Sequence, residues 1–341
     1  MIFGKRAVRR LNLALQGGGA HGAFTWGVLD RLLEDGRMRF DGVSGTSAGA
    51  MNAVMLAQGL SVGGADGARQ ALADFWSAVA RSLPFDVTLP AADGQGVVIA
   101  PPFKMMLQWT HYLSPDQLNP FDLNPLRDIV SAQVDFARLR RASPVKLFIA
   151  TTHANSGKLR VFRNAELSAD VVLASACLPT LHRAIVIDDE PYWDGGYAAN
   201  PAVFPLFYEC VSRDILLVLL TPLKHAETPA SATDIRCRIL EIAFNSTFLR
   251  EMRMFAHLRD YTRRSWLPLG RFERRVSQTR FHLIGAEDLL GALPAETKLA
   301  ANMQFFEMLR DQGRARADDW LQAHAEQVGR HSSVDLGALF Y

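Results

Sequence analysis

The segment Gly45-Thr46-Ser47-Ala48-Gly49 has the spacing G-x-S-x-G, which places a serine on a tight turn between a strand and a helix. The flanking glycines permit the strained backbone of such a turn, and the N-terminus of the following helix favours a developing negative charge. This chemistry makes Ser47 a candidate nucleophile for acyl transfer. An ordinary turn whose serine caps the helix has the same pattern, so the motif alone fits both interpretations.

A serine nucleophile needs a base, and the best candidate is the carboxylate of Asp194. The sequence Asp194-Gly195-Gly196 follows a short predicted strand, 192–193, so the carboxylate emerges at a strand end while two glycines let other backbone approach it. A carboxylate with a pKa near 4 is ionised at pH 7 and can accept the serine proton. The alternative is a plain Asp-Gly turn. The neighbouring acids are interpreted as solvated residues of a hairpin turn: Asp188, Asp189 and Glu190.

Histidine is not expected to serve as the base. Of nine histidines, three lie beside predicted strand ends, namely His153, His182 and His282, and each is interpreted as a surface or packing residue. Only one strand, loop and helix precede Ser47, whereas the nucleophile of an α/β-hydrolase follows several such units. The sequence therefore favours a different α/β fold with a carboxylate base.

A second glycine-rich turn, residues 17–22 with the sequence GGGAHG, follows the predicted strand 11–15. Its successive backbone N–H groups at a helix start can hold an anion or an oxyanion. The same run contains the spacing G-x-G-x-x-G, so a dinucleotide-binding oxidoreductase is the rival interpretation. That fingerprint also needs an acid at the end of the second strand. Here the second strand, 40–44, ends in Ser44 and carries Asp41 at its beginning, which disfavours the nucleotide interpretation.

The elements that must position these turns form a mixed, mostly parallel sheet. The turns follow two parallel strands and should therefore meet at one edge of the sheet. Helices are predicted over 22–33, over 50–60, around 72–79 and over 168–177, with a flexible link at 61–67. Strands are predicted over 11–15, 40–44, 145–152, 159–163, 184–187, 192–193, 215–220 and 280–284.

Composition excludes several function classes. The 341 residues are 49% hydrophobic and 21% charged, which suits a globular protein with a core. The net charge of 37 − 35 = +2 gives no general attraction for nucleic acid. Three cysteines without C-x-x-C spacing favour a reducing compartment. The apolar runs 11–15 and 215–220 are too short for a signal peptide and a membrane helix respectively, so we expect a cytoplasmic protein.

The glycine loop, the G-x-S-x-G turn and the late D-G-G motif, in this order, resemble the patatin-like phospholipase family. The stretch 174–179 is also similar to that family's A-S-x-A-x-P segment, while 180–183 departs from its usual aromatic and proline residues, and His21 stands where many members carry Arg or Lys. The resemblance implies a Ser47–Asp194 dyad with no metal or organic cofactor. It also implies that an oxyanion hole is formed by Gly17, Gly18 and Gly19.

By this resemblance the fold class is α/β, a patatin-like three-layer α/β/α arrangement with a mostly parallel sheet and a helical C-terminal addition. Residues 1–225 would form the acyl hydrolase domain, with 84–125 as an irregular excursion and candidate lid. Residues 226–341 would form a mainly helical extension packed on it. The implied activity is hydrolysis of lipid carboxylic esters, of the phospholipase or lysophospholipase type. A non-catalytic lipid-binding module on the same fold is a further alternative.

The expected partner is a lipid or another acyl ester, with peripheral membrane contact considered, no nucleic acid, and the oligomeric state left open. Flexible apolar residues in the excursion are candidates for binding the acyl chain: Met105, Trp109 and Tyr112. The segment 235–266 has apolar residues at helical spacing interspersed with arginines. Its basic face would meet lipid headgroups, or the helix would simply pack on the core with a solvated face.

Overall fold

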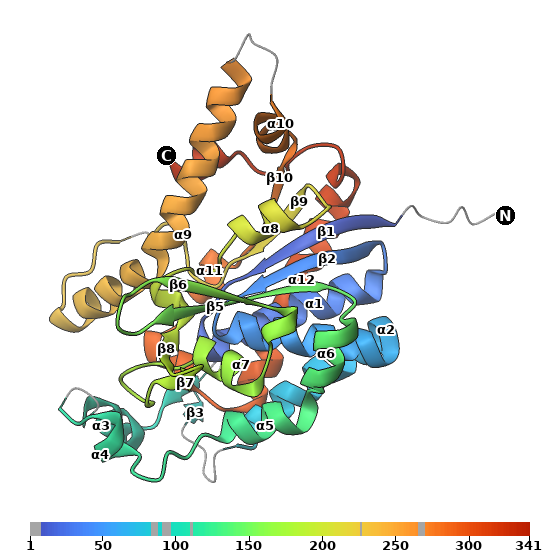
Figure 1. The fold of residues 1–341 in the computed structure, drawn as a ribbon. Coiled ribbons are helices and arrows are strands. Elements are labelled where there is room, and N and C mark those ends of the chain that lie inside the picture. Colours follow the sequence, from blue (N-terminus) through green and yellow to red (C-terminus); the bar gives the residue numbers. More distant parts are fainter. Residues whose placement is uncertain (1–7, 83–87, 91–96, 110–111, 226, 265–269) are drawn as a thin grey trace.

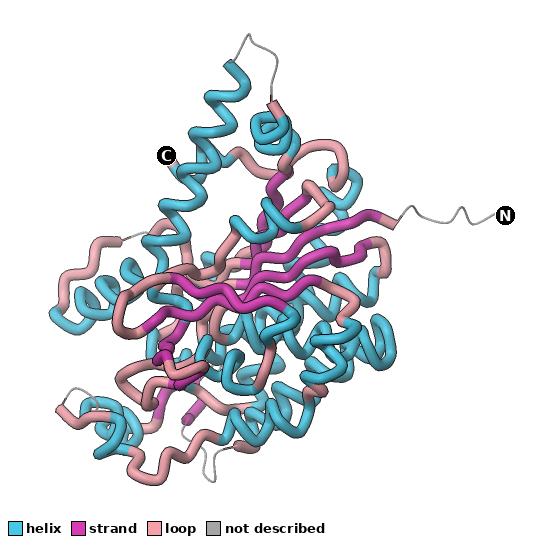
Figure 2. The backbone as a smooth tube through the Cα atoms, in the orientation of Figure 1, coloured by secondary structure: helices cyan, strands magenta, loops and turns pink. Residues whose placement is uncertain are grey.

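The structure is a computed structural model, and it describes residues 8–82, 88–90, 97–109, 112–225, 227–264 and 270–341. A central sheet lies between two layers of helices (Figure 1, Figure 2). The predicted α/β class with a mostly parallel sheet and a helical C-terminal region is confirmed.

The described strands of the central sheet follow the order β10-β9-β1-β2-β5-β8-β7, with β6 paired to β5 (Figure 2). The run from β10 to β5 is parallel, and β6, β7 and β8 add antiparallel pairs. The C-terminal ends of β1 and β2 therefore lie side by side. The strand bounds are β1 Arg9–Leu15, β2 Met38–Gly45, β5 Lys146–His153, β6 Leu159–Arg163, β7 Ile185–Ile187, β8 Glu190–Asp194, β9 Asp214–Val218 and β10 Arg280–Ile284.

Alternating side chains of the buried strands pack into two separate hydrophobic cores, one on each face of the sheet. In β1, Leu13 and Leu15 belong to one core, whereas Ala14 belongs to the other. The first core is covered by α1 Gly22–Asp35, α2 Ala48–Ala80, α5 Pro125–Gln133, α6 Phe136–Ala142, α7 Ala169–Ser175 and α12 Met303–His324. The second is covered by α8 Phe204–Glu209, α9 Ala232–Arg264, α10 Arg271–Gln278 and α13 Leu336–Phe340.

Short elements connect these layers. The predicted excursion 84–125 carries a small hairpin and two helices, although its residues 84–87, 91–96 and 110–111 lie outside the described part. Its elements are β3 Thr88–Pro90, β4 Val97–Ile99, α3 Pro101–Trp109 and α4 Pro115–Leu118. The remaining ones are α11 Glu287–Leu290 and the 3₁₀ turns η1 Gly19–His21, η2 Asn164–Glu166, η3 Gly195–Tyr197, η4 Ala295–Leu299 and η5 Ala325–Gln327.

The predicted link at 61–67 is much shorter in the structure, where two helical segments of α2 meet at a sharp kink. The backbone leaves helical geometry at Gly63 and at Gly64, where φ is +62°. The two halves then pack so tightly that a Cβ atom at Gly59 would lie 2.3 Å from the Cα atom of Ala68. Glycine supplies both the positive φ and the close approach, so a kink replaces a loop.

The chain beyond residue 225 contributes to every layer. Strand β10 pairs in parallel with β9, and α12 packs against α1. A Cβ atom at Gly27 would lie 1.9 Å from the carbonyl oxygen of Arg310, and one at Gly313 would lie 2.1 Å from that of Phe24. The division into units at residue 225 stays a prediction. Among the described residues, no helix combines the length and apolar character needed to cross a bilayer.

Candidate active site

Ser47 occupies the turn between β2 and α2, at the C-terminal edge of the parallel strands. Its backbone has φ 54° and ψ −123°, a left-handed conformation that is strained for a residue with a side chain. The neighbouring glycines are required by close approach. A Cβ atom at Gly45 would lie 2.4 Å from the carbonyl oxygen of Gly49, and one at Gly49 would lie 2.2 Å from that of Leu15. The sequence spacing thus reflects a turn that only glycine can flank.

Two hydroxyl groups, neither of which the sequence singled out, hold this turn in place. The N–H of Ser47 donates to Oγ of Ser175 at 3.0 Å, and that hydroxyl donates to the carbonyl oxygen of Ala150 in β5 at 2.7 Å. Thr46 Oγ1 donates to the carbonyl oxygen of Ala199 at 2.9 Å. Ser175 lies in the stretch 174–179 that carried the family resemblance, which was the only sequence signal for its role.

Asp194 ends β8 and is 1% exposed. Its carboxylate accepts the N–H of Gly196 at 2.7 Å, and its interaction with the Ser47 side chain lowers the pKa of the carboxyl group. The Gly195-Gly196 pair is needed because a Cβ atom at either position would lie within 2.3 Å of another atom, the carbonyl oxygen of Ala150 or Cδ1 of Phe244. The structure therefore brings together the serine and the carboxylate that the motifs predicted.

The electrostatics of Asp194 suit proton transfer near neutral pH. Burial raises the pKa of its carboxyl group to about 7, and the hydrogen bond from Gly196 and the interaction with Ser47 offset only part of that rise. A base is most effective when its pKa lies near the working pH, because it is then both ionised and able to bind a proton. Glu251 is the other carboxyl group with a pKa raised by burial to about 7, but it caps α8 by accepting the N–H groups of Val203 and Phe204.

The glycine loop lies at the same edge, and its three amides are not equivalent. The N–H of Gly17 donates to Oδ1 of Asn200 at 2.7 Å, so this amide is already engaged. The N–H groups of Gly18 and Gly19 have no hydrogen-bond partner among the described residues. Gly19 has φ +58°, and a Cβ atom there would lie 2.2 Å from the carbonyl oxygen of Lys298 in η4. Two free amides therefore stand next to the serine turn.

Gln16, which directly precedes the loop, fixes its position through a buried network that sequence reasoning missed. Its Oε1 accepts the N–H groups of Leu220 and Thr221 at 2.6 and 2.8 Å. Its Nε2 donates to Oδ1 of Asn245 in α9 at 2.7 Å and to the carbonyl oxygen of Asn200 at 3.2 Å. The only sequence signal was a polar residue at the end of an apolar strand.

Two of the three predicted strand-end histidines have other hydrogen-bond partners, and Nδ1 of the third, His182, is buried without one among the described residues. His153 contacts Ser156 and Glu190, and His282 contacts Asp214 and Ser333. Burial lowers the pKa of His182, which favours its neutral form. Within the described part of the chain, none of the three hydrogen-bonds to the Ser47–Asp194 pair.

The candidates for acyl binding are exposed. Met105 and Trp109 on α3 are 61% and 54% exposed, and Tyr112 just beyond it is 85% exposed. Their contact with an acyl chain stays a prediction.

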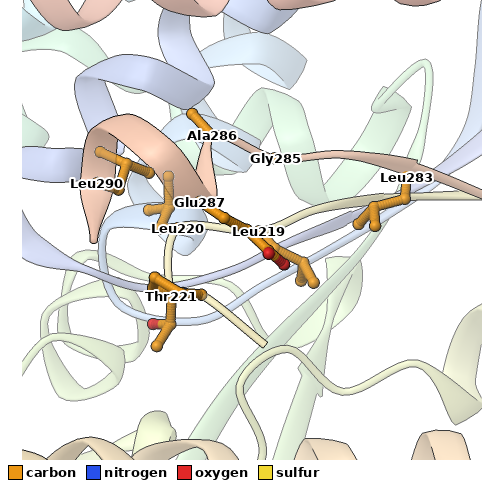
Figure 3. Close-up of a pocket in the computed structure, with 9 residues that line it drawn as sticks. Leu219, Leu220, Thr221, Leu283, Gly285, Ala286, Glu287 and Leu290 are labelled. Carbon is orange, nitrogen blue, oxygen red and sulfur yellow. The ribbon is translucent and has the colours of Figure 1, made fainter. Parts of the chain in front are cut away.

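Two small cavities lie behind the glycine loop, and neither is lined by Ser47 or Asp194. Figure 3 shows the first, a mainly apolar space lined by Leu219, Leu220, Thr221, Pro222, Leu283, Gly285, Ala286, Glu287 and Leu290. The lining of the second includes His21, His225, Glu241 and Lys298. Burial and the nearby charge of Lys298 lower the pKa of His21 to about 3, so its ring is neutral where the family often has a cation.

The structure offers little for the cofactors considered. Asp41 lies within β2, four residues before its C-terminal end, and accepts the N–H groups of Val211 and Ser212 at 2.5 and 2.8 Å. A dinucleotide on the glycine loop would therefore lack its second anchor. No group of three or more His, Cys, Asp or Glu residues suited to a metal ion occurs among the residues that the structure describes.

Comparison with known proteins identifies the family that this chain matches. A family model described as "Patatin-like phospholipase" matches residues 13–207, more than half of the chain, and this range contains the glycine loop, the serine turn and Asp194. VipD from Legionella pneumophila is a similar solved structure, with 16% sequence identity, a TM-score of 0.41, and 92% of this chain and 67% of that chain covered. No curated protein gives a significant match.

Proposed function

The chain belongs to the patatin-like phospholipase family, whose members hydrolyse lipid esters, and we propose that it is a serine acyl hydrolase in which Ser47 is the nucleophile and Asp194 the base. The observation that carries the proposal is the buried Asp194 carboxylate, which interacts with the side chain of Ser47 on a positive-φ turn. A hydroxyl held this way beside an ionised carboxylate is poised to lose its proton as it attacks.

The reaction begins when Ser47 Oγ attacks the carbonyl carbon of a lipid ester and its proton passes to the Asp194 carboxylate. The carbonyl oxygen becomes an oxyanion, which accepts hydrogen bonds from the free N–H groups of Gly18 and Gly19. Collapse of this intermediate breaks the bond to the alcohol, which leaves with the proton from Asp194. Water then attacks the acyl-enzyme, its proton passes to Asp194, and the second collapse releases the fatty acid and restores the Ser47 hydroxyl.

The role of Gly17 differs from that of its neighbours in this proposal. Because its N–H already donates to Asn200, it cannot donate to the oxyanion as well. We assign it the task of holding the loop, and we assign the donor role to Gly18 and Gly19. Each such donor typically contributes about 3 kcal/mol to the stabilisation of the transition state.

Labelling with a fluorophosphonate probe tests the function directly. We expect one probe per chain, attached at Ser47, because only an activated serine attacks the phosphorus atom. Mass spectrometry of the labelled peptide identifies the residue, and Ser61, a half-buried serine in α2, is the matched control position within the same chain. A folded protein that remains unlabelled would favour the non-catalytic lipid-binding module.

The pH dependence of kcat/KM should report the buried carboxyl group. Because Asp194 must be ionised and its pKa is raised to about 7, activity should be constant well above pH 7 and should fall as the pH decreases through 7. Well below that pH the fall should approach tenfold per pH unit. The measurement is kcat/KM for a soluble ester between pH 5 and 9.

Glu251→Gln provides the control for this profile, because Glu251 has a pKa raised to the same value but caps α8 instead of contacting Ser47. Its removal should leave the midpoint unchanged. A midpoint near pH 4 in the wild type, or one that disappears in Glu251→Gln, would contradict the assignment of Asp194 as the base.

A further inference from the structure

The N-terminal half of α9 exposes a row of large apolar side chains to solvent. Ile235, Ile239 and Ile242 follow the spacing i, i+4, i+7 and are 41%, 58% and 50% exposed, and Leu240 beside them is 57% exposed. The opposite side of the same helix packs inward through Phe244 and residues beyond it. A surface helix normally turns such a row toward the core. An uncovered row therefore marks a binding surface.

This row leads directly to the candidate active site. The ring of Phe244, two residues after Ile242, packs against Gly196. A Cβ atom at Gly196 would lie 2.3 Å from this ring. The same ring lies 4.4 Å from the ring of Tyr197, measured between centroids. Asn245, the next residue, accepts the hydrogen bond from Gln16 that positions the glycine loop. A lipid surface bound along the start of α9 (Figure 1) would therefore lie near the glycine turn that follows Asp194.

A second apolar row lies on α3. Met105 and Trp109, at spacing i, i+4, are both more than half exposed. Lys104 on this helix pairs with Glu296 of η4 at 2.6 Å, and Lys298 of the same turn interacts electrostatically with Glu241 of α9. The turn η4 thus connects both helices to the glycine loop. We call these two rows together the docking face: Met105, Trp109, Ile235, Ile239, Leu240 and Ile242.

The charges around the docking face nearly balance. Lys104 pairs with Glu296, and Arg238 pairs with Glu241. The exposed Arg236 and Asp234 have opposite signs, and the half-buried Lys298 is a further cation beside Glu241. These four cations and three anions leave a net charge of +1, so the face presents apolar side chains with only a weak field. Such a surface complements a zwitterionic lipid interface and not a polyanion.

We propose that the docking face seats this protein on the surface of a zwitterionic lipid bilayer, with the edge of the sheet that carries Ser47 turned toward the lipid. The inference rests on the proposed function, because a lipid ester must leave its aggregate to reach that edge. A helix lying in the interface with its isoleucines in the acyl boundary is the arrangement that exposed apolar rows favour. A second copy of the chain on the same face would instead cover the approach to the site.

Vesicle sedimentation tests the docking face, with all variants made in a Ser47→Ala background so that the lipid stays intact. The probe is phosphatidylcholine vesicles at low and high salt. The test variant carries Ile235→Ser, Ile239→Ser and Ile242→Ser. The control carries Val62→Ser, Tyr208→Ser and Val211→Ser, which remove side chains that are 63%, 60% and 67% exposed and lie outside the docking face. Circular dichroism verifies that both are folded.

We expect the test variant to bind vesicles at least about tenfold more weakly than the control. The reason is that it lacks the three exposed isoleucines that would be buried in the lipid interface. Binding of the control should change little with salt, since nearly balanced charges give little counterion release. When the same isoleucine substitutions are made in the protein that retains Ser47, hydrolysis of vesicle lipid should fall. Hydrolysis of a soluble short ester should stay within twofold of the protein without these substitutions.

Equal vesicle binding by the two variants would overturn the inference, as would an unmodified protein that does not bind vesicles. A dimer in light scattering that the isoleucine substitutions convert to a monomer would assign the docking face to a second copy. Absence of soluble-ester hydrolysis in the Ser47 protein would contradict the proposed function instead, and the sedimentation result would still decide the docking face.

Discussion

Ser47→Ala and Asp194→Asn are each expected to lower kcat/KM for a soluble ester by about 10⁴-fold or more. The first variant removes the attacking oxygen. The second leaves a neutral amide, which cannot accept the serine proton, at a position where the carboxylate is 1% exposed and interacts with the Ser47 side chain. The measurement is steady-state hydrolysis of a p-nitrophenyl ester at pH 8, where the wild-type carboxylate is ionised.

The decreases in kcat/KM caused by Ser47→Ala and by Asp194→Asn should not be additive on a free-energy scale. Because nucleophile and base act in a single proton-coupled attack, the double variant should be about as slow as either single variant. A folded Asp194→Asn protein whose activity stays within tenfold of the wild type would disprove the base assignment. His182 and His282 would then be the next positions to replace.

Thermal unfolding provides the control for the fold of Asp194→Asn. The folded-state pKa of Asp194 is about 7, whereas an unfolded aspartate titrates near 4, so the folded state binds the proton more tightly. The stability cost of the ionised group is therefore absent below pH 4, grows as the pH rises, and is complete above pH 7. It corresponds to at most about 4 kcal/mol. The asparagine variant should accordingly gain stability relative to the wild type between pH 4 and pH 8.

Gly18→Val should lower kcat by about 10²- to 10³-fold while the chain still folds. A Cβ atom at Gly18 would lie 3.0 Å from Cδ1 and 3.3 Å from Cβ of Leu220, so the loop must shift by a few tenths of an ångström. This shift moves the free amides of Gly18 and Gly19 away from the position of the oxyanion. The loss is measured as the decrease in kcat in steady-state assays at saturating ester concentration.

Gly63→Val is the matched control for this loop variant. A Cβ atom at Gly63 would meet nothing within 4 Å, and its φ of −139° lies outside the left-handed region. Its turnover should equal that of the wild type. Full activity in Gly18→Val would place the oxyanion hole elsewhere.

The local features of the site followed from the sequence because short-range sterics determine them. A serine between Gly45 and Gly49 predicts a sharp strand-to-helix turn, and the structure shows the positive φ at Ser47 that such a turn needs. The placement of Asp194 at a strand end followed in the same way from its short strand and the glycines after it. The mostly parallel sheet followed from alternating apolar strands and helices.

Local reasoning failed where packing between separate helical segments or distant parts of the chain sets the conformation. Residues 61–67 contain glycine and small residues typical of a link, yet α2 only kinks there because Gly59 packs onto Ala68. The polar residues that hold the site were missed for the same reason. Ser175 lies 128 residues from the amide it binds at Ser47, and Asn200 lies 183 residues from Gly17.

The sequence by itself thus determined which residues are candidates for the chemistry and which turns present them, since backbone sterics and side-chain periodicity act within a few residues. Only the tertiary structure decided that Gly17 is engaged while Gly18 and Gly19 are free, and that Asp194 is buried deeply enough to raise its pKa to about 7. Hydrogen-bond partners and desolvation depend on groups brought together from distant segments. No pattern of neighbouring residues encodes them.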